Sequence, residues 1–174
     1  MQRRTLLTVG AIGAAALAVA GGGLALIQPA RRDGAFGEAA QQMLRAVARA
    51  TLGSLLPAGA AEEAAALTAY LARLQTTLAG MPTAMQAEVD ELLTIASSAP
   101  GRRLLVGLAA PWAEADAAAV AAALQDMRLS PLALRQQAFH ALRDLTNAAY
   151  FADSSTWATI GYPGPRDIQP VAPA

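Results

Sequence analysis

The chain has no cysteine, which excludes disulfides, thiolate catalysis, iron–sulfur clusters and covalent haem attachment. It has no lysine either: all thirteen basic residues are arginine, and thirteen acidic residues balance them. Because the net charge is zero, nothing in the composition predicts a nucleic-acid partner. Redox chemistry is not expected from this chain alone, so no cofactor is expected in it.

Charged and aromatic residues are scarce. Only 15% of the 174 residues are charged and 5% are aromatic, whereas 55% are hydrophobic, with alanine prominent among them. A chain of this length suits one modest domain, and an alanine-rich composition with few β-branched residues favours close-packed helices. The sequence therefore predicts an all-α fold: a bundle of five to six helices, with an N-terminal signal or transmembrane helix and an extended C-terminal tail.

The amino terminus, "MQRRTLLTVGAIGAAALAVAGGGLALIQPARR", has the order of an export signal. Arg3 and Arg4 precede an uncharged stretch from Thr5 to Ile27, which is a basic region followed by an apolar one. With Leu6 and Leu7, the pair resembles a twin-arginine signal. An apolar run of this length also suits a membrane anchor, because about twenty helical residues span about 30 Å of hydrocarbon. Residues 1–32 are predicted to be a signal peptide or an anchor.

Cleavage of this segment is left open by the sequence. Residues 18–20, Ala-Val-Ala, have the small-x-small form of a cleavage site but leave a short apolar region, and Arg31 and Arg32 could equally act as a stop. Removal of everything before Asp33 would take four arginines away and leave nine basic against thirteen acidic residues. Such an acidic remainder suits a soluble periplasmic domain.

Residues 33–152 are expected to form the helical domain. Hydrophobic residues recur at spacings of three and four, and proline or glycine separates the runs. Thr83 is a predicted cap, and Ser130 with Pro131 is predicted to start the longest helix. The predicted helices cover residues 36–56, 62–78, 83–96, 114–127 and 131–150, with a short apolar piece at 102–112.

Catalytic patterns are weak. His140, the one histidine, is expected on the polar side of the last helix with Asp144 as its partner, which suits a solvated ion pair or an interface contact. The chain has no Glu-x-x-His or His-Glu-x-x-His spacing and no glycine-flanked serine. The sequence therefore predicts no catalytic, cofactor or metal site.

Half of the chain's aromatic residues lie in "YFADSSTWATIGYPGP", residues 150–165. Asp153 and the two serines after it can cap a helical turn that carries Trp157, and glycine and proline then stiffen "IGYPGP" into an extended segment. We predict that residues 153–174 form a docking tail, since aromatic anchors are favoured in interfaces. The alternative is a tail that only covers its own bundle.

This tail, headed by an arginine-containing amphipathic helix and a twin-arginine signal, is similar to the gluconate 2-dehydrogenase subunit 3 family. "LGSLLP" at residues 52–57 and Trp112 also fit that family's pattern. Its members are the small, or gamma, subunits of membrane-associated flavin dehydrogenases. The resemblance implies that the partner-binding residues are Tyr150, Phe151, Trp157, Ile160, Gly161, Tyr162, Pro163, Gly164 and Pro165.

The family implies a non-catalytic partner of a large FAD-containing oxidoreductase of the glucose-methanol-choline class. In such complexes the large subunit oxidises an alcohol, sugar or sugar acid, and a cytochrome c subunit usually takes the electrons. The expected location is the periplasm, in association with the membrane, with the twin-arginine translocase as the export partner. The substrate lies in the large subunit's pocket and is not fixed by this chain.

The residues themselves supply a reason for this arrangement. The twin-arginine route moves folded cargo, and this chain carries the signal without a cofactor site that would require folding before export. An export escort and structural subunit is therefore the first hypothesis. The second is a membrane-anchored helical scaffold or binding protein with an unrelated periplasmic partner, and a weaker third is a small enzyme using His140.

Overall fold

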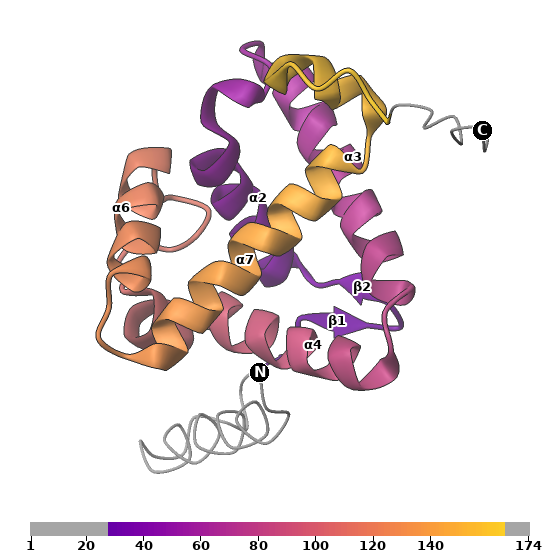
Figure 1. Ribbon diagram of the computed structural model, residues 1–174. Helices are drawn as coiled ribbons and strands as arrows, with labels where there is room; N and C mark the ends of the chain where they lie inside the picture. Colours follow the sequence, from indigo (N-terminus) through magenta and orange to yellow (C-terminus); the bar gives the residue numbers. More distant parts are fainter. Residues whose placement is uncertain (1–27, 166–174) are drawn as a thin grey trace, which may run out of the picture.

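The computed structural model describes residues 28–165, and this part of the chain is mostly helical (Figure 1). The all-α prediction is confirmed. Among the described residues, no helix has the length and apolar character needed to cross a membrane. The predicted export residues Arg3, Arg4, Leu6 and Leu7 lie outside the described part. The helices are α2 (Glu38–Leu52), η2 (Gly53–Leu55), α3 (Ala60–Ala79), α4 (Thr83–Ser97), α5 (Ala99–Gly101), η3 (Arg102–Val106), α6 (Ala117–Arg128), α7 (Ala133–Phe151) and η4 (Ser154–Ile160).

Helix α2 is the centre of the bundle. It packs against α3, α4, α6 and α7, and α7 runs diagonally across its front (Figure 1). Three of its buried residues are alanines, which let neighbouring backbones approach closely, while Met43, Leu44 and Val47 fill the space between the helices. The alanine-rich composition is therefore used for close helix packing.

One predicted cap and one predicted helix start are wrong. Thr83 is the first residue of α4 and its side chain caps nothing; Pro82 precedes it. Helix α7 begins at Ala133 instead of Pro131, because Ser130 and Pro131 belong to the preceding turn. The Ser130 hydroxyl accepts a hydrogen bond from the Leu132 N–H at 3.2 Å, so it stabilises that turn instead of capping the helix.

A short β-hairpin, which was not predicted from the sequence, precedes α2. Strands β1 (Arg31–Arg32) and β2 (Ala35–Phe36) pair antiparallel around Asp33 and Gly34, which have φ angles of 50° and 80°. Asp-Gly is the common signature of such a two-residue turn, and it was present in the sequence.

The hairpin is attached to α4. The Arg31 guanidinium binds both carboxylate oxygens of Asp90, with N–O distances of 2.5 and 2.8 Å, and its side chain is only 8% exposed. The Ala30 N–H donates to the Thr94 hydroxyl at 2.8 Å. Residues 30–32, assigned above to the signal segment, are thus part of the folded body, which begins before Asp33.

Candidate docking site

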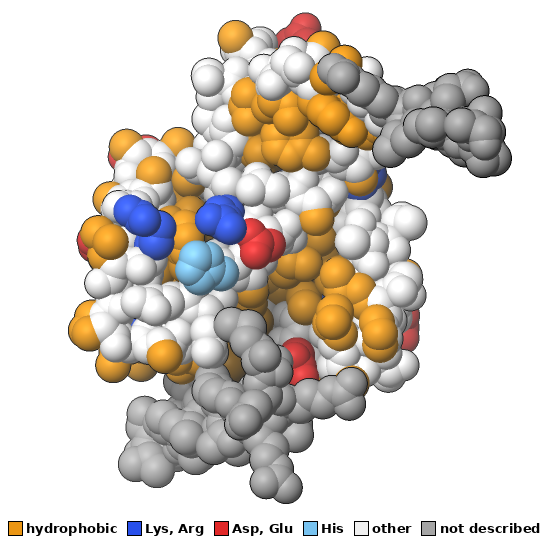
Figure 2. Space-filling model, viewed as in Figure 1, with side chains coloured by type: hydrophobic (Ala, Val, Ile, Leu, Met, Phe, Trp, Pro, Cys, Tyr) orange, Lys and Arg blue, Asp and Glu red, His pale blue; other side chains and the backbone are white. Residues whose placement is uncertain are grey.

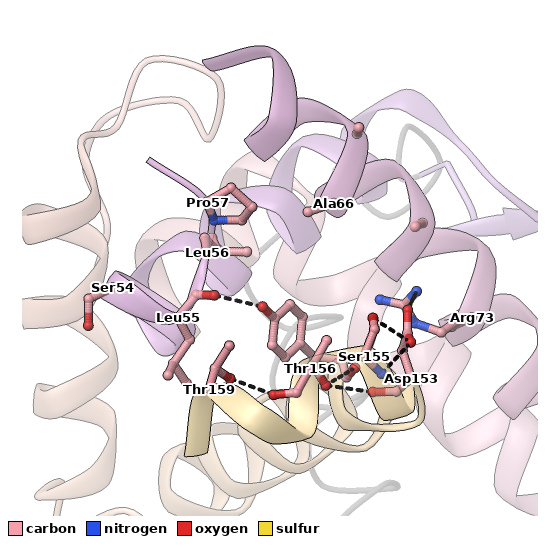
Figure 3. A pocket seen from close by; sticks show the side chains of 13 residues that line it. Ser54, Leu55, Leu56, Pro57, Ala66, Arg73, Asp153, Ser155, Thr156 and Thr159 are labelled. Carbon is pink, nitrogen blue, oxygen red and sulfur yellow. Dashed lines mark hydrogen bonds and ion pairs between the residues drawn. The ribbon is translucent and has the colours of Figure 1, made fainter. Parts of the chain in front are cut away.

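An open groove of about 650 Å³ lies between η2, the first half of α3 and η4 (Figure 3). It brings together parts of the two segments that carry the family resemblance: residues 54–57 of the first and five residues between 150 and 159 of the second, whereas Trp157 and residues 160–165 do not line it. The Tyr150 hydroxyl donates a 2.7 Å hydrogen bond to the Leu55 carbonyl, which joins positions 95 residues apart. The lining residues are Ser54, Leu55, Leu56, Pro57, Ala65, Ala66, Ala69, Arg73, Tyr150, Asp153, Ser155, Thr156 and Thr159.

Tyr150 supports the groove from inside. Its side chain is only 4% exposed and packs in the core at the end of α7, and burial raises the pKa of its phenol. Phe151 is half-buried against the same core, edge-on to Tyr150 with the ring centres 5.2 Å apart. These two predicted binding residues are therefore placed to hold the groove in shape, with little surface left to offer a partner.

Asp153 fixes the start of η4, as the sequence predicted. Its carboxylate accepts hydrogen bonds from the N–H and hydroxyl of Ser155 at 3.0 and 2.7 Å. It also forms an ion pair with Arg73, with an N–O distance of 3.1 Å. Arg73 also donates to the Ala149 carbonyl at 2.9 Å, so it joins α3 to the end of α7. The bonds from Ser155, with a smaller contribution from the charge of Arg73, hold the pKa of Asp153 below its ordinary value.

The segment after η4 bends back around Trp157, and we call residues 157–164 the hook. The indole N–H of Trp157 donates to the Phe151 carbonyl at 2.7 Å, and the Tyr162 ring meets the indole edge-on with centres 5.2 Å apart. Gly161, with φ of 70°, turns the chain, and the Tyr162 N–H donates to the Trp157 carbonyl at 3.0 Å. The backbone of Gly164 lies against the indole, because a β-carbon there would be 3.5 Å from Cζ3.

The hook corrects the prediction of an extended segment. The expected track through residues 160–165 is closed around Trp157, because left-handed glycines at 161 and 164 let the chain turn. Ile160 and Tyr162 project outward, 51% and 45% exposed. Figure 2 shows hydrophobic side chains gathered at the upper end of the molecule, where Figure 1 places η4. Pro163 and Pro165 are also exposed.

The groove's polar groups are mostly occupied within its own wall. The Ser155 hydroxyl donates to Asp153, the Thr156 hydroxyl to the Asp153 carbonyl at 2.7 Å, and the Thr159 hydroxyl to the Thr156 carbonyl at 2.5 Å. The groups left to contact a bound partner are hydroxyl and carbonyl oxygens that can still accept hydrogen bonds, together with methyl groups that face small alanines on α3. This surface suits a peptide segment that approaches closely.

His140 does not pair as predicted. Asp144 accepts two hydrogen bonds from Arg143, at 3.0 and 2.8 Å, and His140 instead lies exposed, edge-on to Phe139 with ring centres 5.2 Å apart. Within residues 28–165, no group of three or more histidine or acidic side chains is placed to hold a metal ion.

The far wall of the groove was not predicted from the sequence. Ala65, Ala66 and Ala69 lie one turn or less apart on α3, and Arg73 follows one turn later on the same side. That run of small residues ending in an arginine was the available signal, but alanine is so common in this chain that the pattern did not stand out.

No protein-family model, curated protein or solved structure matches this chain. The similarity to the gluconate 2-dehydrogenase subunit 3 family is therefore carried by the quoted residues alone.

Proposed function

We propose that this chain is the non-catalytic small subunit of a periplasmic, membrane-associated flavin dehydrogenase complex. It acts as the export escort and structural partner of an FAD-containing large subunit of the glucose-methanol-choline class, which oxidises an alcohol, sugar or sugar acid. One observation carries the proposal: the two segments on which the family resemblance rests are joined by the bond from Tyr150 to Leu55, and residues 54–57 of the first and five residues between 150 and 159 of the second line a single groove.

The hook supplies the docking element in this proposal. Its conformation is held by the Trp157 indole bond and by the turn at Gly161, so little conformational freedom is left to lose on binding. Ile160 and Tyr162 are the anchors. Burying the exposed half of a tyrosine removes on the order of 100 Å² from water, worth about 2.5 kcal/mol before ordering costs.

The export part of the proposal rests on the sequence. The twin-arginine translocase moves folded proteins, so a signal containing Arg3 and Arg4 can bring a partner that has already loaded its flavin. A cytochrome c subunit is the proposed electron acceptor in the assembled complex.

Co-purification of the full chain from native membranes and periplasm tests docking. We expect Ile160→Ala with Tyr162→Ala to abolish recovery of the flavin subunit while helical circular dichroism and the melting temperature stay within a few degrees of wild type. Met85→Ala is the matched control, since its side chain is 49% exposed on α4 and does not line the groove. A flavin subunit recovered at the wild-type level with the hook variant contradicts the docking site. Recovery of a partner that contains no flavin supports the second hypothesis, a membrane-anchored scaffold with an unrelated periplasmic partner.

Replacement of Arg3 and Arg4 by lysine tests the escort role separately. We expect both this chain and its unaltered flavin partner to stay in the cytoplasm. If the partner still reaches the periplasm, the escort role is wrong, although docking through the hook can still stand.

A further inference from the structure

Exposed leucines gather at the end of the molecule opposite the groove. Leu129, Leu132 and Leu134 lie on the connection between α6 and α7 and at the start of α7, with exposures of 65%, 61% and 42%, and Leu104 on η3 is 67% exposed. We call these four residues the leucine corner. Figure 1 places the connection between α6 and α7 at the lower end of the molecule and η4 at the upper end.

The leucine corner is held in place by hydrogen bonds. The Arg135 guanidinium donates to the Leu105 and Val106 carbonyls at 2.9 and 3.1 Å, which joins the start of α7 to η3. The Ser130 side chain is buried and accepts from the Leu132 N–H, and its carbonyl accepts from the Gln136 amide at 2.8 Å. These hydrogen bonds fix the backbone next to the exposed leucines.

Arginines outnumber acidic residues around these leucines. The two segments that carry them, residues 102–106 and 126–137, contain four arginines and one acidic residue, Asp126, although residues 28–165 as a whole carry twelve acidic residues against ten arginines. Arg102 and Arg135 bind backbone carbonyls, whereas Arg103 and Arg128 are exposed. Exposed aliphatic side chains bordered by arginine match a bilayer surface with anionic headgroups.

The chain also enters the described body at this lower end. Ala30 is bound to Thr94 on α4, and α4 leads through α5 directly into η3, which carries Leu104. Upstream of that entry point, residues 5–27 contain no charged residue. A chain segment that suits hydrocarbon is therefore attached to the body on the same side as the leucine corner.

We propose that the leucine corner rests on an anionic phospholipid bilayer, with its leucines at the boundary of headgroups and acyl chains and with Arg103 and Arg128 bound to lipid phosphates. This contact would orient the groove and the hook away from the membrane. The proposal does not depend on docking of a flavin subunit, because it concerns the other end of the molecule.

The absence of cysteine allows a direct test with the full chain. Leu132→Cys and, as the matched control, Tyr162→Cys are each labelled with an environment-sensitive fluorophore and mixed with phosphatidylcholine vesicles containing phosphatidylglycerol and a spin-labelled lipid. We expect a blue shift and several-fold stronger quenching at position 132 than at 162, with unchanged helical circular dichroism in both. Equal quenching at the two positions overturns the proposal, because the N-terminal segment alone would then hold the chain on the vesicle.

The arginines are tested in the same assay. We expect Arg103→Gln with Arg128→Gln, or vesicles of phosphatidylcholine alone, to lower the quenching at position 132 several-fold. If neither the arginine substitutions nor the removal of anionic lipid lowers the quenching at position 132, the assignment of an anionic lipid is wrong. A blue shift at position 132 that grows with protein concentration without vesicles also overturns the proposal, since it would identify a second copy of the chain as the occupant.

Discussion

Tyr150 and Tyr162 lie twelve residues apart in one aromatic segment, yet they have opposite environments. Tyr150 is 4% exposed and bonds to Leu55 across the groove, whereas Tyr162 is 45% exposed and leans on Trp157 at the surface. The difference follows from position: Tyr150 continues the buried stripe of α7 formed by Leu142, Leu145 and Ala149, while Tyr162 follows the glycine turn that ends η4. The density of aromatic residues singled out this segment, but only the helical phase separates the buried Tyr150 from the exposed Tyr162.

The largest expected effect separates these two tyrosines by stability. Tyr150→Ala removes a buried ring and leaves the Leu55 carbonyl without its donor, so we expect a loss of roughly 3–5 kcal/mol in the free energy of unfolding. Tyr162→Ala should cost less than about 1 kcal/mol, as surface substitutions usually do. Urea unfolding followed by circular dichroism measures both, and similar losses for the two variants would show that the hook belongs to the core.

A second expectation concerns the core tyrosines at high pH. Burial raises the pKa of Tyr70 to about 12, and its hydroxyl meets Thr146 at 3.4 Å. A raised pKa means that the folded state holds the proton more tightly, so this stabilisation is complete below about pH 10 and is lost as pH rises through about 12. We expect wild type to lose roughly 2–3 kcal/mol over that range. Tyr70→Phe should lose less, and equal losses in urea unfolding would contradict the burial effect.

A smaller effect tests the turn that holds Tyr162 outward. Gly161 has φ of 70°, so Gly161→Ala should destabilise the hook by about 1 kcal/mol. The amide of Tyr162, bonded to the Trp157 carbonyl, should then exchange its hydrogen about fivefold faster. Gly80→Ala is the matched control, because Gly80 has φ of −80° and an added β-carbon makes only ordinary contacts. Unchanged exchange in Gly161→Ala would mean that the turn does not hold the hook.

The smallest expected effect appears in acid. The pKa of Asp153 is lowered by the bonds from Ser155, so its contribution to the hook is present above about pH 4 and is lost as pH falls below that value. We expect the indole N–H resonance of Trp157 to shift in that range. Trp112, buried with its own bond to the Ala96 carbonyl, serves as the internal reference. In Asp153→Asn the shift of the Trp157 signal should disappear, and its persistence would assign the change to another group.

Several features could be predicted because they depend on neighbours along the chain. The buried stripe of α7 followed from its helical spacing, and Asp153 caps η4 because the serine it binds is two residues away. The hairpin at Asp33 and Gly34 also had a local signature, although it was overlooked beside the apolar segment that precedes it.

Other features depend on contacts between distant residues. From the sequence, Arg31 was assigned to the end of the signal segment. In the structure it pairs with Asp90 on α4, a contact between distant residues that the sequence does not show. Asp144 had two basic residues within reach in the sequence, and the structure pairs it with Arg143 instead of His140. The leucine corner likewise joins η3 to the start of α7 through Arg135.

The sequence by itself determined the helical class and the places where helices stop, because alanine, glycine and proline act through local backbone preference. Only the tertiary structure decided that residues 54–57 and the chain around Tyr150 and Thr156 share a groove, that Tyr150 supports it and that Ile160 and Tyr162 face outward. Those outcomes rest on long-range packing, in which α3 and α7 meet and Arg73 binds both Ala149 and Asp153, and no spacing along the chain encodes such a meeting.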